Sequence, residues 1–351
     1  MKRRLAMMTI VCFGGLRAMA GEYAFSEPSD DRWHYPFNFS GGARATASCF
    51  GSTGDPEYTT FNDRDGILLI GWRTHLQIPM GLPAASYGVD GVRIILTHLG
   101  AAPVAPNWTV DLTPDEWFHM DYPITDPDAG QPIELFGMGF GPTFTYANWT
   151  ESSGYEGGND TEFAPRDPYP FVYQGSTLTK LHIEDNVKDE FTPVPWAIGV
   201  PVGYTPGTQQ VPFPVVFDVN LALSGENVRN YFREQLSGGR VLAAVTSLQV
   251  TSLQAATGYP TFYNKEGAAI DPAGAAPLLE ITLNPTGDLN GDRRNDLMDF
   301  RGAWECGEGP GIVPSPSPPL DATKCFFLFD FDEDGDVDLM DIAELTIRFD
   351  S

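Results

Sequence analysis

Two segments near the C-terminus carry oxygen-bearing side chains at the same spacing. Residues 288–299 and 330–341 align at an offset of 42 residues, and both end in Asp-Leu-Met-Asp. Each segment places Asp or Asn at positions 1, 3, 5, 9 and 12 of a twelve-residue stretch. Oxygen donors at this spacing, together with the backbone carbonyl of position 7, wrap a hard cation such as Ca²⁺. The pattern therefore predicts two loops that bind two calcium ions.

The predicted ligands follow from these positions. In loop 1 (288–299) they are Asp288, Asn290, Asp292, Asp296, Asp299 and the carbonyl of Arg294. In loop 2 (330–341) they are Asp330, Asp332, Asp334, Asp338, Asp341 and the carbonyl of Asp336. Loop 2 has glycine at position 6, where the chain turns sharply, whereas loop 1 has Arg293 there. The alternative is an acidic solvated linker, but a linker does not need the apolar residues that recur at helical spacing after both loops.

Neither loop is expected to follow an amphipathic helix, because a predicted strand precedes loop 1 and the apolar run 325–329 precedes loop 2. This duplicated loop–helix pattern resembles a dockerin type I module over residues 287–349. The resemblance implies two half EF-hands that fold around calcium and dock on a cohesin-like or other surface protein in extracellular, often polysaccharide-degrading, complexes. Family members often use Ser or Thr for partner contact directly after position 9. This chain has Leu297-Met298 and Leu339-Met340 there.

The N-terminus has the layout of a secretory signal peptide. Basic residues at 2–4 precede an apolar run from Leu5 to Leu16, and Ala18-Met19-Ala20 reads as a cleavage site before Gly21. The apolar run is too short to span a bilayer, and no later stretch approaches ~20 apolar residues. We therefore expect a secreted or surface-attached protein cleaved after Ala20.

Cysteine usage fits an oxidising compartment. Removing Cys12 with the signal peptide leaves three cysteines. Cys306 and Cys325 lie close together in the acidic C-terminal segment and are predicted to form a disulfide. Cys49 is then the odd one, expected as a buried thiol.

Residues 21–283 are predicted to form one mainly β domain, a jelly-roll-like β-sandwich with one helix. Short apolar or alternating runs, rich in Val, Ile and Phe and separated by turn residues, indicate strands. They span 66–72, 92–97, 214–219, 241–246 and 278–283. The helix is expected over 224–236, capped by Ser224 and stopped by Gly238-Gly239. The Pro- and Gly-rich stretches 121–170 and 186–212 are expected as surface loops, and the domain boundary falls at 284.

Charge and motif content exclude several functions. The formal net charge is −26, and the four basic groups of residues 1–20 leave −30 after cleavage, which opposes binding to nucleic acid or an anionic membrane. The five histidines are scattered, and no nucleophile elbow, P-loop or dinucleotide fingerprint occurs. Two features leave other chemistry open. Carboxylates that could form a glycosidase pair are Glu116, Glu134, Glu151 and Glu184. Aromatic residues that could stack on sugar rings are Trp108, Trp149, Tyr155, Tyr169 and Trp196.

The domain weakly resembles secreted bacterial β-sandwich modules of the DNRLRE or carbohydrate-binding kind, through its segments 64–72, 239–248 and 276–281. We therefore expect a non-catalytic extracellular protein whose sandwich binds a glycan or surface component and whose C-terminal module (284–351) binds calcium and docks on a protein. The alternatives are a secreted polysaccharide-acting enzyme with a dockerin tail and a structural cell-surface protein.

Overall fold

The computed structural model describes most of the chain after the predicted signal peptide. The described residues are 21–35, 38, 40–51, 64–99, 110–112, 131–154, 166–184, 186, 189, 191–204, 212–249 and 259–349. Residues 1–20, predicted as a signal peptide, lie outside these ranges. Within them, every helix is too short or too polar to cross a lipid bilayer.

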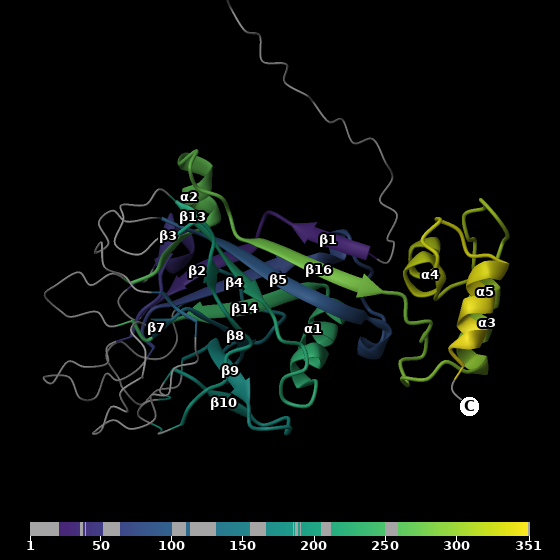
Figure 1. Ribbon diagram of the computed structural model, residues 1–351, viewed down its shortest axis with the longest axis horizontal. Coiled ribbons are helices and arrows are strands. Elements are labelled where there is room, and N and C mark those ends of the chain that lie inside the picture. Colours follow the sequence, from purple (N-terminus) through teal and green to yellow (C-terminus); the bar gives the residue numbers. More distant parts are fainter. Residues whose placement is uncertain are drawn as a thin grey trace, which may run out of the picture.

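One antiparallel sheet contains both ends of the domain. Its strands lie in the order β1, β16, β5, β13, β12, and β15 joins β5 to β3. Their bounds are β1 Gly21–Phe25, β3 Thr46–Ser48, β5 Gly88–His98, β12 Val200–Pro201, β13 Phe213–Asp218, β15 Thr261–Tyr263 and β16 Leu278–Asn284. The first strand of the domain therefore pairs with its last (Figure 1).

The second sheet has the order β10, β9, β8, β14, β4, β2, with β11 on β8. Its strands are β2 Asp30–His34, β4 Ile67–Arg73, β8 Glu134–Gly139, β9 Tyr169–Tyr173, β10 Lys180–His182, β11 Ala197–Ile198 and β14 Arg240–Thr246. A separate parallel pair joins β6 Val110–Asp111 to β7 Gln131–Pro132. Two antiparallel sheets of this kind agree with the predicted β-sandwich.

The core lies between the two sheets. Alternate residues of β16 and β5 point inward and meet the inner face of β4 and β14, and all are buried in one apolar cluster. The inner residues of β4 are Leu68, Ile70 and Trp72. The outer face of β4 is buried as well, because Ile67 and Leu69 pack with Met138 and Trp149. Burial on both faces explains why this strand reads as a continuous apolar run.

The predicted strands are all present, and the predicted helix is α1, Asn227–Ser237. The expected cap is wrong. Glu226, in a left-handed conformation, occupies the N-cap position and makes no side-chain capping bond, and Ser224 lies in the preceding turn with φ of 55°. Helix α1 buries Val228, Tyr231 and Phe232 against the sandwich. Packing against the sandwich therefore stabilises the first turn of α1, which has no capping side chain.

The stretches expected as surface loops contain strands. β8 lies within 121–170 and β9 begins there, and β11 and β12 lie within 186–212. Glycine alternates through β8 and proline interrupts β9, which weakens the sequence signal for a strand. Both strands are buried throughout. Their position inside the sheet therefore outweighs their low propensity.

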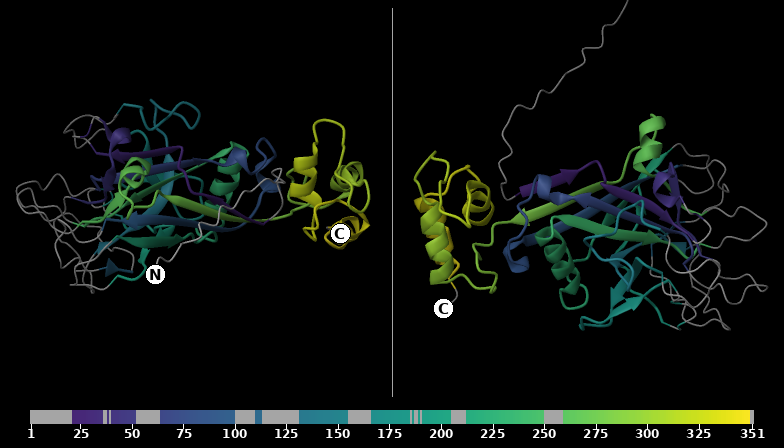
Figure 2. Two further views of the ribbon diagram at one scale, coloured as in Figure 1. Left: turned by 90° about the horizontal axis from the view of Figure 1, so that it is seen from above. Right: turned by 180° about the vertical axis from the view of Figure 1, so that it is seen from behind.

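Beyond β16 the chain is helical. The helices are α3 Leu297–Cys306, α4 Ala322–Phe329 and α5 Leu339–Ile347, whereas the short α2, Lys265–Ile270, belongs to the sandwich domain. The three C-terminal helices pack on one another and sit at one end of the sandwich, past the end of β16 (Figures 1 and 2). Phe327 of α4 meets Tyr87 of the sandwich at a ring-centroid distance of 5.5 Å.

The buried His98 makes stability depend on pH. Its ring stacks on Phe213 at 4.7 Å and meets the edge of Phe262 at 5.7 Å. Burial lowers the pKa of His98 from 6.5 to about 4. Because the unfolded chain binds this proton more readily, the stability contribution is complete above pH 6.5 and is lost as the pH falls toward 4.

In wild type, the free energy of unfolding should fall between pH 6.5 and 4. We expect the variant His98→Phe to reduce this fall by up to about 3 kcal/mol. Denaturant unfolding at a series of pH values measures this slope. A variant slope equal to that of wild type would show that His98 does not carry the dependence.

Candidate metal centre

The two acidic loops have the same backbone turn. Positions 4 and 6 are left-handed in both, with φ values of 75° and 67° at Gly291 and Arg293 in loop 1, and of 60° and 87° at Glu333 and Gly335 in loop 2. Glycine thus occupies position 4 in loop 1 and position 6 in loop 2. Each loop therefore carries one non-glycine residue in a region that disfavours side chains.

The last carboxylate of each loop closes it in the same way. In loop 1, Asp299 accepts the amide of Leu289 at 2.8 Å and that of Asp296 at 3.0 Å. In loop 2, Asp341 accepts the amide of Phe331 at 2.7 Å and that of Asp338 at 2.9 Å. These bonds tie position 12 to positions 2 and 9. The repeat seen in the sequence is therefore a repeat of structure.

Carboxylates of each loop also cap the helix that follows it. Asp296 and Asp338 are the N-caps of α3 and α5, and each forms a capping box with the Asp three residues later. A capping box satisfies amides at the start of a helix that have no other partner. Positions 9 and 12 therefore have a local structural role whether or not an ion is bound.

Loop 2 contains buried carboxylate oxygens without a hydrogen-bond partner among the described residues. Asp330 is fully buried, and although its Oδ2 accepts the amide of Gly335 at 3.1 Å, its Oδ1 has no such partner. Oxygens of Asp330, Asp332 and Asp334 all lie within 4.8 Å of one another. Burying acceptors without donors is costly. A cation among these oxygens would remove that cost, so the donor set fits a hard divalent ion.

The electrostatics of loop 2 agree with this geometry. The pKa of Asp330 is raised to about 6, first by burial and then by the negative charge of Asp341 and of the neighbouring Asp334 and Asp332. Carboxylates that repel one another in a buried site favour either a proton or a metal ion. Oxygen chemistry, charge and spacing therefore point to the same class of ligand.

The side chain of Asp336 also lies near the acidic residues of loop 2. The sequence assigned only its backbone carbonyl to the ion, but its carboxylate is buried and lies within 4.8 Å of ligand atoms of Asp338 and Asp341. Its Oδ2 also accepts the amide of Gly311, in the segment that joins the two repeats. The side chain therefore ties loop 2 to this connection.

Loop 1 has fewer negative charges available to an ion. Asp288 already accepts the amides of Gly291 and Asp292, at 2.7 and 3.1 Å, through one oxygen and that of Arg293, at 2.8 Å, through the other. Position 3 is the neutral Asn290, which donates to Asp292 at 3.0 Å. Loop 1 therefore has the correct shape but a weaker field than loop 2.

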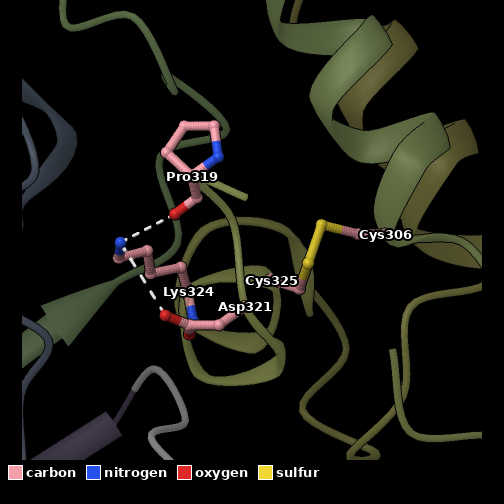
Figure 3. Close-up of a disulfide and its surroundings, with 5 residues drawn as sticks. All are labelled: Cys306, Pro319, Asp321, Lys324 and Cys325. Atoms are coloured by element: carbon pink, nitrogen blue, oxygen red, sulfur yellow. Dashed lines mark hydrogen bonds and ion pairs between the residues drawn. A yellow bond between two sulfur atoms is a disulfide. The ribbon is translucent and has the colours of Figure 1, made fainter. Parts of the chain in front are cut away.

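A disulfide joins the two repeats, as predicted. Cys306 ends α3, and Cys325 lies in α4 (Figure 3). Both are fully buried, and Cys49 is the buried free thiol. Beside the bridge, Lys324 donates to the carbonyl of Pro319 at 2.9 Å (Figure 3). The connection between the repeats is therefore held by the disulfide and by the hydrogen bond from Lys324 to Pro319.

One prediction about the module is wrong. The apolar run 325–329 is part of helix α4, so a helix does precede loop 2. Asp321 caps this helix by accepting the amide of Lys324 at 2.9 Å. All residues from Cys325 to Phe329 are buried. The five consecutive buried apolar residues at its C-terminal end leave no alternation of polar and apolar positions there, which is why no amphipathic pattern revealed the helix.

The apolar pairs after position 9 are exposed. Leu297 and Met298 are 79% and 62% exposed, and Leu339 and Met340 are 75% and 68% exposed. They occupy the first two positions of α3 and α5. The module therefore shows equivalent apolar pairs on both repeats.

The carboxylates proposed as a glycosidase pair have other partners. Glu134 is fully buried and pairs with Arg64 at 2.5 Å. Glu151 pairs with Lys265, and Glu184, also buried, lies 3.7 Å from the ring of His182. Glu116 lies outside the described residues. Each of the three described carboxylates thus lies beside an arginine, lysine or histidine side chain.

Sequence reasoning missed a third acidic cluster in the sandwich. Asp31, Glu151 and Glu266 come from three separate segments and offer oxygens within 4.8 Å of one another. The ammonium of Lys265 lies among them, 3.4 Å from Asp31 and 3.7 Å from Glu266, and bonds to Glu151. No spacing along the chain could have revealed this group. The lysine supplies the cation here.

The aromatic residues proposed for sugar stacking are mostly unavailable. Trp149, Trp196 and Tyr169 are 0%, 1% and 7% exposed. Trp196 lies in an aromatic cluster with Phe171 and Tyr231. Trp108 and Tyr155 lie outside the described residues. The buried rings therefore pack the core and cannot stack on a glycan.

Comparison with known proteins does not assign the chain to a family. No protein-family model matches the chain, and no curated protein is similar to it.

Proposed function

We propose that residues 284–349 form a calcium-binding docking module, and that the whole chain is a secreted, non-catalytic binding protein. The observation that carries the proposal is the buried Asp330. Its Oδ1 has no hydrogen-bond partner among the described residues, and it offers a carboxylate oxygen within 4.8 Å of Asp332 and Asp334, in a loop whose spacing recurs at 288–299. Buried, mutually repelling carboxylates are costly to the fold unless a cation joins them.

The ions would be held by the ligand sets of the two loops. Loop 2 would use Asp330, Asp332, Asp334, Asp338, Asp341 and the carbonyl of Asp336, and loop 1 would use Asp288, Asn290, Asp292, Asp296, Asp299 and the carbonyl of Arg294. Bound calcium would supply positive charge that links distant oxygens of each loop and so stabilises the helices they cap. Loop 2, which has more carboxylates and no basic residue, is the stronger site.

The other parts of the chain support a binding role. The equivalent exposed Leu-Met pairs favour docking on a protein such as a cohesin-like partner. The sandwich, with a jelly-roll-like connectivity, is proposed to bind a glycan or surface component outside the cell. A binding role is favoured over hydrolysis because the described candidate carboxylates have ion-pair partners.

Calorimetric titration of the full chain with calcium tests the proposal. We expect two bound ions in wild type and one in each of the variants Asp330→Ala and Asp288→Ala. The matched control is Asp321→Asn, which changes an acidic helix cap outside both loops and should leave two ions. The proposal fails if no heat of binding appears, or if both loop variants titrate like wild type.

A second experiment tests the sandwich. Retention of the full chain on insoluble polysaccharides is expected without release of reducing ends. Release of reducing sugar, lost on Glu184→Gln, would instead indicate a hydrolase.

A further inference from the structure

Loop 1 lies against the sandwich. Gly291 has no room for a Cβ because Pro83 of the sandwich packs against it. Arg293 donates to Oδ1 of Asn230, on α1, at 3.2 Å. Directly before the loop, Thr286 donates to the carbonyl of Ser86 at 3.0 Å. Loop 1 thus meets two separate elements of the sandwich domain, the turn at 83–86 and helix α1.

The contacts involve positions 4 and 6 of loop 1, and position 6 is where this loop departs from the usual calcium loop. Gly291 and Arg293 are positions 4 and 6, and both are left-handed. Glycine is needed at position 4, where the sandwich leaves no space for a side chain. A long side chain at position 6 reaches the sandwich. Arg293 at position 6 therefore fits contact with the sandwich, whereas loop 2 keeps glycine at that position.

The contact with Asn230 also fixes the position of the positively charged Arg293 side chain. Oδ1 of Asn230 accepts both Arg293 and Arg233, each at 3.2 Å. Burial and the neighbouring Arg229 and Arg293 lower the pKa of Arg233, whereas the negative charges of Glu226 and Asp288, a predicted ligand of loop 1, oppose that shift. Asn230 therefore holds the guanidinium of Arg293 on the sandwich. A released guanidinium would compete with a cation for those carboxylates.

We propose that loop 1 is a calcium-dependent joint, in which seating of the module on the sandwich and calcium binding at loop 1 favour each other. This inference rests on the proposed function. Because coupling between two equilibria is reciprocal, a change on the sandwich side that touches no ligand must alter the calcium affinity of loop 1. Asn230 is a positioning residue for that site.

The affinity of loop 1 is measured alone by titrating calcium into full-length Asp330→Ala. Adding Asn230→Ala is expected to weaken binding about 3- to 10-fold, the effect of losing one hydrogen bond. Asn230→Asp keeps an acceptor oxygen and should retain the affinity. The matched control places Asn230→Ala in the Asp288→Ala background, where loop 2 should bind calcium unchanged.

Hydrogen exchange gives a readout independent of affinity. Calcium should slow the exchange of amides in α1 and at 84–87 at least about 3-fold in Asp330→Ala, and this slowing should disappear with Asn230→Ala. If Asn230→Ala changes neither the calcium affinity nor the calcium-dependent slowing of exchange, the coupling between loop 1 and the sandwich is overturned, whereas the proposed calcium binding stands. Absence of calcium binding in both backgrounds would instead overturn the proposed function and the joint with it.

Discussion

Truncating either member of the Arg64–Glu134 pair is expected to lower the free energy of unfolding by about 3–5 kcal/mol. Both side chains are fully buried, and their closest atoms are 2.5 Å apart. Arg64 also donates to Asn186 at 3.0 Å and lies over the ring of Phe136 at 5.7 Å. The changes Glu134→Ala and Arg64→Ala each leave a charge in the interior of the sandwich without its partner.

The direction of the Glu134 pKa supports this expectation. Burial raises the pKa of Glu134 to about 7, and the guanidinium of Arg64 opposes that rise. Removing Arg64 takes away the opposing charge, so Glu134 would bind a proton near neutral pH. The variant Arg64→Ala should therefore take up about one proton on folding at pH 7, which potentiometric titration against denaturant measures.

Two controls separate the pair from general effects of mutation. The double variant Arg64→Met with Glu134→Leu should cost less than the sum of the single truncations, because it leaves no unpaired charge. Glu305→Ala breaks an exposed pair with Arg301 on α3 and should change stability by less than about 0.5 kcal/mol. Single truncations no more costly than Glu305→Ala would contradict the prediction.

The second large effect is expected at the disulfide. The variant with both Cys306→Ser and Cys325→Ser should lose about 3 kcal/mol from the C-terminal module, because a bridge across 19 residues restricts the unfolded chain. A module of this size buries a small core and depends on such cross-links. Without calcium the open module is therefore expected to unfold at room temperature.

Far-ultraviolet circular dichroism of the full chain, with calcium or with a chelator, follows the helices of the module. Four conditions are compared: wild type and the double serine variant, each with and without calcium. The largest loss of helix should occur in the chelated variant. A reducing agent should reproduce this loss in wild type and add nothing to the variant. Equal helix content in all four conditions would show that neither cross-link holds the module.

Local patterns determined the elements of this chain. Val- and Ile-rich runs gave the strands β4, β5, β13, β14 and β16, since a strand in a sandwich core needs β-branched residues on its buried face. Acidic spacing identified the two loops, because a turn depends on a few neighbouring residues. Their role as caps of α3 and α5 emerged only from the structure. The disulfide followed from two cysteines close in sequence.

Tertiary structure alone decided burial and long-range partners. Trp149 and Trp196 look like surface aromatics in loops, yet the sheets cover them. Helix α4 became visible only in the tertiary structure, where residues 325–329 are buried. Arg64 meets Glu134 across 70 residues, and loop 1 meets Asn230 on a helix of the sandwich. These contacts depend on how two sheets and a helical module pack, and no local propensity carries that information.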